Sequence, residues 1–341
     1  MPGESMDYEE LDDFLFTQGF DSSFEALTGK IQGTSNDTVF EILEMIGDLF
    51  VSNLQEIKGQ LLQLFGICLL FCIIHQLSKA YGKESIEKYG YYIYFLCGAT
   101  ICLNLFAGGY ETVFKTATVL VRFMEVLLPT YGIALMLSNG ANTSGAYYGA
   151  VLLMLFLIEI LVLTIFLPGT KLYMATRFVN QGVGENFFSK FLKLFEDGFS
   201  WGLKAILIGV CSINTIQGLI FPAVDRVRRL SVGKTVSLIP GVGTLAGSAT
   251  ELLLSSGSLL KNSMGIAAVL VLVALCAPAL MKLISMIVGL RLLEACLEPV
   301  LGNKAGALME GCYKSIQMLL KIQIHILTVF SLSLVIMTAL S

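Results

Sequence analysis

The residues best placed to do chemistry are charged side chains that lie inside otherwise apolar runs. Glu159 lies in the middle of the run LFLIEILVLTIFL, and Arg122 and Glu125 lie three residues apart in a second run. A charge at the centre of a bilayer costs about 2.5–3.5 kcal/mol on insertion scales, so such residues indicate a functional site or a pair between helices. Arg122 and Glu125 share one helical face and can pair with each other. Glu159 is either a functional residue or a structural partner of a basic residue in another run, and the available ones are Arg122, Lys204 and Lys282.

A second group of candidate residues lies in and beside the segment Ser231–Lys261, which is rich in Gly, Ser and Leu and almost free of charge. Glycines four residues apart let helix backbones approach closely in a bilayer, and glycine also permits a tight turn. Two interpretations stay open: a re-entrant hairpin that packs among the membrane spans, and a pair of surface helices with the glycines as breakers. The candidate polar and packing residues here are Asp225, Gly241, Gly243, Gly247 and Glu251.

The sequence predicts no catalytic residues, no metal site and no cofactor. It contains no Ser-His-Asp, Cys-His or paired-carboxylate arrangement, and His75 and His325 have no further ligands at metal spacing. Gly233-Lys234-Thr235 resembles the end of a phosphate-binding loop, but that loop requires glycine where this chain has Arg228. Most of the eight cysteines lie inside apolar runs, which indicates a packing role. We therefore do not expect an enzyme.

Composition identifies the class of protein. Hydrophobic residues make up 55% of the 341 residues and charged residues only 14%, whereas soluble domains have about 25% charged residues. The apolar residues fall in long runs separated by short polar stretches, which is typical of membrane helices. The net charge of -4 argues against a nucleic-acid partner. We expect an all-α fold, a polytopic transmembrane helical bundle in the lipid bilayer.

The apolar runs predict about six to seven spans, because roughly 20 apolar residues cross the hydrocarbon. The seventh, Val113–Met136, is either a span that faces protein or two shorter interfacial pieces. The loops on the two sides of the membrane carry equal numbers of basic residues, so the orientation is not predicted. The other six predicted spans are Leu61–Leu77, Tyr89–Ala107, Ala146–Leu167, Trp201–Phe221, Met264–Leu290 and Leu319–Leu340.

Two further segments stand out, one because it is amphipathic and the other because it is acidic. Asn186–Phe199 has phenylalanines on one face and charged residues on the other, which predicts an amphipathic helix on the membrane surface. Eight carboxylates lie between Glu4 and Glu25, and residues 38–58 have helical amphipathic spacing. The acidic stretch is either disordered or a loosely held docking segment. We expect an acidic tail and amphipathic segment over 1–58 and a multi-pass membrane domain over 59–341.

The carboxyl-terminal half carries motifs that resemble a known family. They are INTIQGLIFPAV at Ile213–Val224, LIPGVGTLAGSATELLLSSGSLLKNSMGIAAVLVL from Leu238, and LEPVLGN from Leu297, preceded by FMEVLLPTYGIAL from Phe123. In this order they resemble the stage III sporulation protein AE family of endospore-forming bacteria, over roughly residues 60–341. The family usually begins with a cleavable signal sequence, whereas this chain begins with an acidic tail.

The resemblance implies a function that the composition does not. It implies a multi-pass protein of the mother-cell membrane around the forespore, and a subunit of the channel that joins the two cells. The implied partners are the other membrane proteins of the sporulation-stage III operon and stage II sporulation protein Q. The alternative is a self-contained transporter of a small solute or ion, which Glu159 and the broken segment Ser231–Lys261 would suit.

Overall fold

The fold was analysed in a computed structural model. It describes residues 9–17, 37–82, 84–139, 141–182, 188–236, 243–301 and 303–339, and in several of these ranges only the backbone. Every described element is helical, as the apolar runs predict. The elements are α1 (Glu9–Thr17), α3 (Asp37–Tyr81), α4 (Glu84–Asn139), α5 (Ala141–Leu157), η1 (Ile158–Phe166), α6 (Leu167–Gly182), α7 (Ser189–Val236), α8 (Gly243–Leu301) and α9 (Asn303–Ala339).

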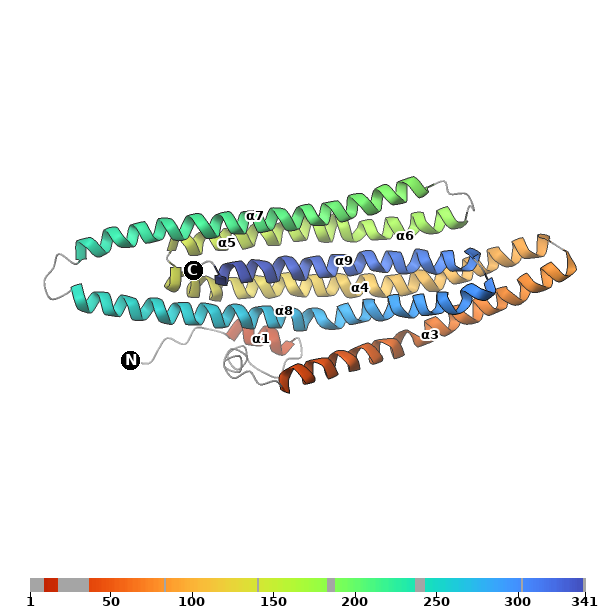
Figure 1. Ribbon diagram of the computed structural model, residues 1–341, viewed down its shortest axis with the longest axis horizontal. Helices are drawn as coiled ribbons and strands as arrows, with labels where there is room; N and C mark the ends of the chain where they lie inside the picture. Colours follow the sequence, from red (N-terminus) through yellow and green to blue (C-terminus); the bar gives the residue numbers. More distant parts are fainter. Residues whose placement is uncertain are drawn as a thin grey trace.

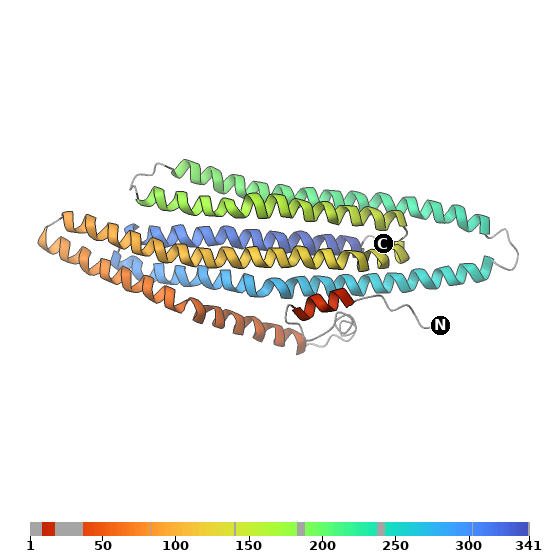
Figure 2. The same ribbon diagram turned by 180° about the vertical axis from the view of Figure 1, so that it is seen from behind.

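The long helices lie nearly parallel or antiparallel in one elongated bundle (Figure 1). Helices α4, α8 and α9 form its centre, since α8 packs most extensively on α9 and α4 contacts both of them. Helices α5 to α7 cover one side, and α3 covers the other; the view from behind shows the same layers (Figure 2). The α3–α4 hairpin extends beyond the other helices at one end, and α7 and α8 extend beyond them at the other.

The described part of the chain has five helices that are long and apolar enough to cross a membrane. Their length exceeds what one bilayer needs. Helix α4 has 56 residues, which at 1.5 Å per residue is about 84 Å, against a hydrocarbon core of about 30 Å. Each long helix must therefore leave the hydrocarbon somewhere along its course. The five candidate spans are Phe50–Ser78, Ser85–Ile133, Val151–Gly182, Ser263–Leu297 and Gly306–Ile336.

The prediction of two separate spans at Tyr89–Ala107 and Val113–Met136 is wrong in one respect. Both lie in the single continuous helix α4, and Pro129 lies inside it without ending it. Glu111, which lies between the two apolar runs and looked like a loop residue in the sequence, lies on the exposed face of the helix, where charge does not interrupt backbone hydrogen bonding. Residues 38–58, predicted as an amphipathic segment of their own, likewise continue without a break into the first predicted span, and both lie within α3.

Two other predictions concern α7. From Ser189 on, the predicted amphipathic helix Asn186–Phe199 is the first part of the 48-residue α7 and not a separate element. Phe195 packs on Tyr173 of α6, and the ring of Phe199 lies edge to face with that of Phe166 of η1 at 5.2 Å. The predicted span Trp201–Phe221 also lies within α7. Side chains 217–221 are outside the described residues, so this span stays a prediction.

The helix that runs without a break from Ala141 to Gly182 has a π-helical middle section. Helix α5 passes into η1 and then into α6 without an intervening loop. The backbone N–H of Leu167 donates to the carbonyl of Val162, five residues back, which is the repeat of a π-helix. π-Helical segments occur frequently at functional sites, and this one begins beside the charged residue that the sequence singles out.

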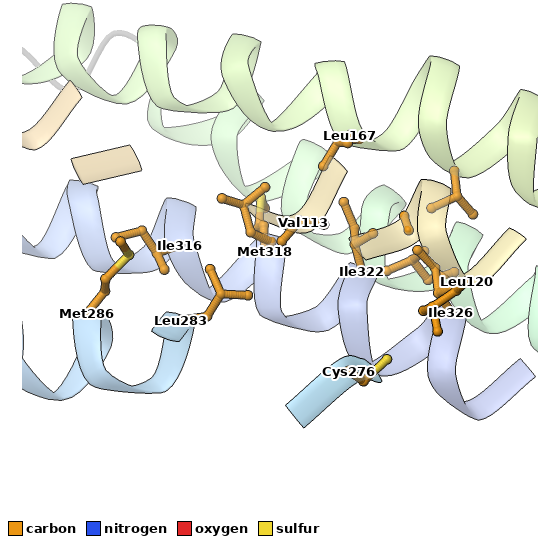
Figure 3. Close-up of a cluster of buried hydrophobic side chains, with 14 of the residues drawn as sticks. Val113, Leu120, Leu167, Cys276, Leu283, Met286, Ile316, Met318, Ile322 and Ile326 are labelled. Atoms are coloured by element: carbon orange, nitrogen blue, oxygen red, sulfur yellow. The ribbon is translucent and has the colours of Figure 1, made fainter. Parts of the chain in front are cut away.

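The core lies where α4, α6, α8 and α9 meet (Figure 3). Ile322 and Ile326 are fully buried at helical spacing on α9, beside Cys276 of α8. A Cβ added at Gly109 of α4 would lie 3.3 Å from a methyl group of Leu283, so glycine is what allows α4 to approach α8 here. The fully buried Gln323 donates its amide N–H to the Cys276 sulfur at 3.3 Å. Apolar contacts with a few internal hydrogen bonds therefore hold the centre together.

The acidic tail contains a short docked helix. Helix α1 buries Leu11, Phe14 and Leu15 and contacts α4. The rings of Phe14 and Phe123 lie 5.9 Å apart. Of the two interpretations of this stretch, docking holds for Glu9–Thr17, while residues 1–8 and 18–36 lie outside the described residues. The division of the chain at residue 58 stays a prediction, and α3 runs through it without a break.

Core packing on α9 can be tested by comparing two isoleucines two residues apart. Ile322 is fully buried and Ile324 is 45% exposed. We expect Ile322→Ala to destabilise the detergent-solubilised protein by about 2–5 kcal/mol, because it removes packed methyl groups and leaves a cavity. Ile324→Ala should have little effect. Thermal unfolding followed by circular dichroism measures both, and equal midpoints for the two variants would contradict this packing.

Candidate functional site

The exposed face of α4 carries a line of polar side chains along a candidate span. Glu111, Lys115, Thr118, Arg122 and Glu125 are all exposed and are spaced four, three, four and three residues apart. This spacing places them above one another on one helical face. We call these five residues the α4 stripe. Both signs of charge occur in it, and all five residues lie within the candidate span Ser85–Ile133.

Only one ion pair forms within the α4 stripe. Lys115 Nζ lies 2.7 Å from Glu111 Oε1, and both side chains are largely exposed. The expected pair between Arg122 and Glu125 is absent, although both residues are described. Neither has an ion-pair partner in the described part of the chain. Contact with lipid would leave two charges uncompensated at a cost of about 2.5–3.5 kcal/mol each. The α4 stripe therefore requires water or protein against it.

Glu159 and its expected partners are not brought together. Lys282 of α8 bonds instead to Glu56 of α3, with 2.7 Å between Nζ and Oε1. Glu159 is exposed at the start of η1, and Lys204 is exposed on α7. Within the described residues neither of these two side chains forms an ion pair. Glu159 thus resembles the α4 stripe: it is a charged group on a candidate span that turns outward and lacks a counter-charge there.

A groove of about 720 Å³ runs beside the α4 stripe, between α4 and α8. Its α4 wall includes the ammonium group of Lys115 and two threonine hydroxyl groups. Pro278 of α8 has no N–H, so the carbonyl of Ala274, four residues earlier, lacks its usual helical donor. An apolar groove with a few such polar groups can orient a polar ligand or a segment of another protein. Its lining residues are Phe114, Lys115, Thr116, Thr118, Val119, Ala274, Leu275 and Pro278.

A second polar cluster joins α6 to α7 and is structural. Glu196 accepts hydrogen bonds from the hydroxyl of Tyr173 and from Arg177, whose Nη2 lies 2.8 Å from Oε1. Arg177 Nε also donates to the Tyr173 hydroxyl at 2.9 Å. Burial raises the pKa of Glu196, but the hydrogen bonds from Tyr173 and Arg177 outweigh it, so the pKa lies below its usual value. We call Tyr173, Arg177 and Glu196 the α6–α7 clasp.

The glycine-rich candidates are only partly described. Asp225 lies in α7, and Gly243, Gly247 and Glu251 lie in the first part of α8, but their surroundings are outside the described residues. Gly241 lies outside the described residues altogether. The backbone assigns residues 231–236 to the end of α7 and residues 243–261 to the start of α8. The re-entrant hairpin stays a prediction.

Comparison with known proteins decides the family. The family model of stage III sporulation protein AE matches residues 22–341, almost the whole chain. The chain belongs to the stage III sporulation protein AE family. The stage III sporulation protein AE of Bacillus subtilis (strain 168) is 25% identical over 287 residues, which cover 83% of this chain and 72% of that protein. No solved structure matches the chain.

The α4 stripe of this sporulation protein was predicted only in part. Lys115, Arg122 and Glu125 were recognised as charges in the predicted span Val113–Met136, whereas Glu111 and Thr118 were not. The signal was available in the spacing of four, three, four and three residues from Glu111 to Glu125. Among the described residues, no three His, Cys, Asp or Glu side chains are placed to hold a metal ion. The chemistry that the site offers is recognition of polar groups.

The α6–α7 clasp predicts a pH-dependent stability. Ionised Glu196 accepts the hydrogen bonds, and its folded-state pKa is lowered, so its contribution is present above the unfolded pKa of about 4.3 and is lost as the pH falls through the folded value. We expect Glu196→Gln to lower the unfolding temperature at pH 7 and to lower it progressively less as the pH falls below 4. Thermal unfolding of both proteins between pH 7 and pH 3 gives this difference. A difference that does not change with pH would contradict the assignment.

Proposed function

We propose that this protein is a membrane subunit of the channel that joins the mother cell to the forespore during endospore development. Its family, and the five long apolar helices among its described residues, support a sporulation protein of the membrane. The observation that carries the proposal further is the α4 stripe, because a self-sufficient bundle in lipid would not expose charges on a span. As part of an assembly, the α4 stripe would lie against another subunit or beside an aqueous path.

The proposed partners are the other membrane proteins of the sporulation-stage III operon and stage II sporulation protein Q, and the proposed location is the mother-cell membrane around the forespore. Charged groups on a membrane helix favour such partners, since each uncompensated charge that gains a counter-charge or water removes an energetic cost. Nucleic acid is not a proposed partner, and no catalytic role is proposed.

A self-contained transporter of a small solute or ion is the second candidate. The groove between α4 and α8 favours it, because Lys115, two threonine hydroxyls and the free carbonyl at Ala274 could bind a polar solute within a candidate span. The two functions differ in what the isolated protein does. A transporter moves its solute when reconstituted alone in liposomes, whereas a channel subunit requires its partners.

The function of the α4 stripe can be tested in the sporulating cells that encode this chain. We expect Arg122→Leu with Glu125→Leu to leave the protein in the membrane but to lower co-purification of its partners and the yield of heat-resistant spores. The loss should be at least about tenfold, the factor that 1.4 kcal/mol of association free energy provides. As a control, Glu310→Gln with Lys314→Gln removes a charged pair from α9.

Three results would distinguish the two proposed functions. Co-purification of sporulation membrane proteins with the wild type, and its loss in the stripe variant but not in the control, supports the channel subunit. Normal spore yield and normal partner recovery in the stripe variant contradict the proposal. Solute uptake by liposomes that contain this protein alone would favour the transporter.

A further inference from the structure

A second groove, of about 490 Å³, lies on the surface between η1–α6 and α7. Every side chain that lines it is apolar, which distinguishes it from the groove beside the α4 stripe. It is open to the outside, and its rim residues Leu172 and Leu194 are 56% and 70% exposed. Its lining residues are Ile165, Phe166, Gly169, Leu172, Phe191, Leu194, Phe195, Gly198 and Phe199.

Two glycines and three aromatic rings shape this groove. A Cβ added at Gly198 would meet no heavy atom within 4 Å, so the glycine leaves open space. The aromatic floor is rigid: the rings of Phe195 and Phe199 are stacked at 6.1 Å, and Phe166 packs edge to face on Phe199. At one end the α6–α7 clasp fixes the separation of the two helices. The groove is therefore a preformed feature of the bundle.

The charges around the groove are not symmetrical. Lys190 and Lys193 are exposed in the first turns of α7, and Lys190 lies one turn before the rim residue Leu194. Arg177 is already paired with Glu196, whereas Lys190 and Lys193 form no ion pair with any of the described residues. Asp197 lies about one helical turn after Lys193 on α7. The end of the groove near the start of α7 thus attracts an anion, while the remainder accepts only apolar groups.

We propose that this groove binds an anionic phospholipid, with part of one acyl chain between α6 and α7 and the phosphate headgroup beside Lys190 and Lys193. The wall of the groove formed by η1 and α6 belongs to the candidate span Val151–Gly182, so acyl chains surround it in the membrane. Each buried methylene group contributes about 0.8 kcal/mol, and the lysines add a preference for negative headgroups. Such a lipid would fill the space beside Gly198 and complete the contact between the two helices.

The proposal can be tested by native mass spectrometry of the full-length protein, delipidated in detergent and titrated with phosphatidylglycerol or phosphatidylcholine. We expect the wild type to retain phosphatidylglycerol in preference to phosphatidylcholine. Gly198→Leu should weaken phosphatidylglycerol binding at least about tenfold, because it excludes two or more methylene groups from the groove. Gly209→Leu is the matched control, since Gly209 is also an open glycine on the exposed surface of α7 but does not line the groove.

The headgroup site is tested separately with Lys190→Gln and Lys193→Gln combined. This variant should lose the preference for phosphatidylglycerol and bind both lipids equally. A Lys204→Gln variant controls for general loss of charge on α7. Phosphatidylglycerol binding that is the same in wild type, Gly198→Leu and Gly209→Leu would overturn the acyl-chain groove, and an unchanged headgroup preference in the lysine variant would overturn the anionic specificity.

Discussion

The structure depends on one constraint: charged side chains on a membrane helix must meet water, a counter-charge or another protein. The α4 stripe does not meet this requirement within the bundle, because Arg122 and Glu125 are exposed and form no ion pair among the described residues. Elsewhere in the bundle, charges are paired between helices. Lys282 bonds to Glu56 across α8 and α3, and Arg177 bonds to Glu196 across α6 and α7. In the proposed assembly, the exposed charges would be the groups that contact other subunits or water.

The length of the helices adds a second constraint. A helix of about 84 Å cannot lie wholly inside about 30 Å of hydrocarbon, so part of the bundle projects from the bilayer or is covered by other subunits. The acidic helix α1 docks through Phe14 on Phe123 of α4, and its carboxylates favour water, headgroups or protein on the side of the bundle that it covers. Both observations favour a subunit of a larger structure over a bundle that lies in lipid alone.

The sequence predicted the helical class, most of the apolar runs and the family, because these depend on composition and on local motifs. It did not predict that α4 is continuous. Glu111 lies between the two predicted spans and looks like a loop residue, although its i, i+4 pair with Lys115 on an exposed face stabilises a helix. Long-range pairs such as Glu56–Lys282, 226 residues apart, depend on how the helices pack, which no local pattern specifies. The same holds for the α6–α7 clasp, whose hydrogen bonds join two different helices.

The central claim is that the α4 stripe faces water or protein and not lipid. Its most direct test is a nitroxide label at Thr118, compared with one at Leu96, which is 65% exposed on the same helix, in the purified assembly returned to lipid. The exposed cysteines Cys97 and Cys296 would be replaced by serine. Power saturation should give Leu96 the lipid profile, with high collision with oxygen and little with an aqueous nickel chelate. The account predicts that Thr118 collides with the nickel chelate or with neither reagent, and a lipid profile at Thr118 would contradict it.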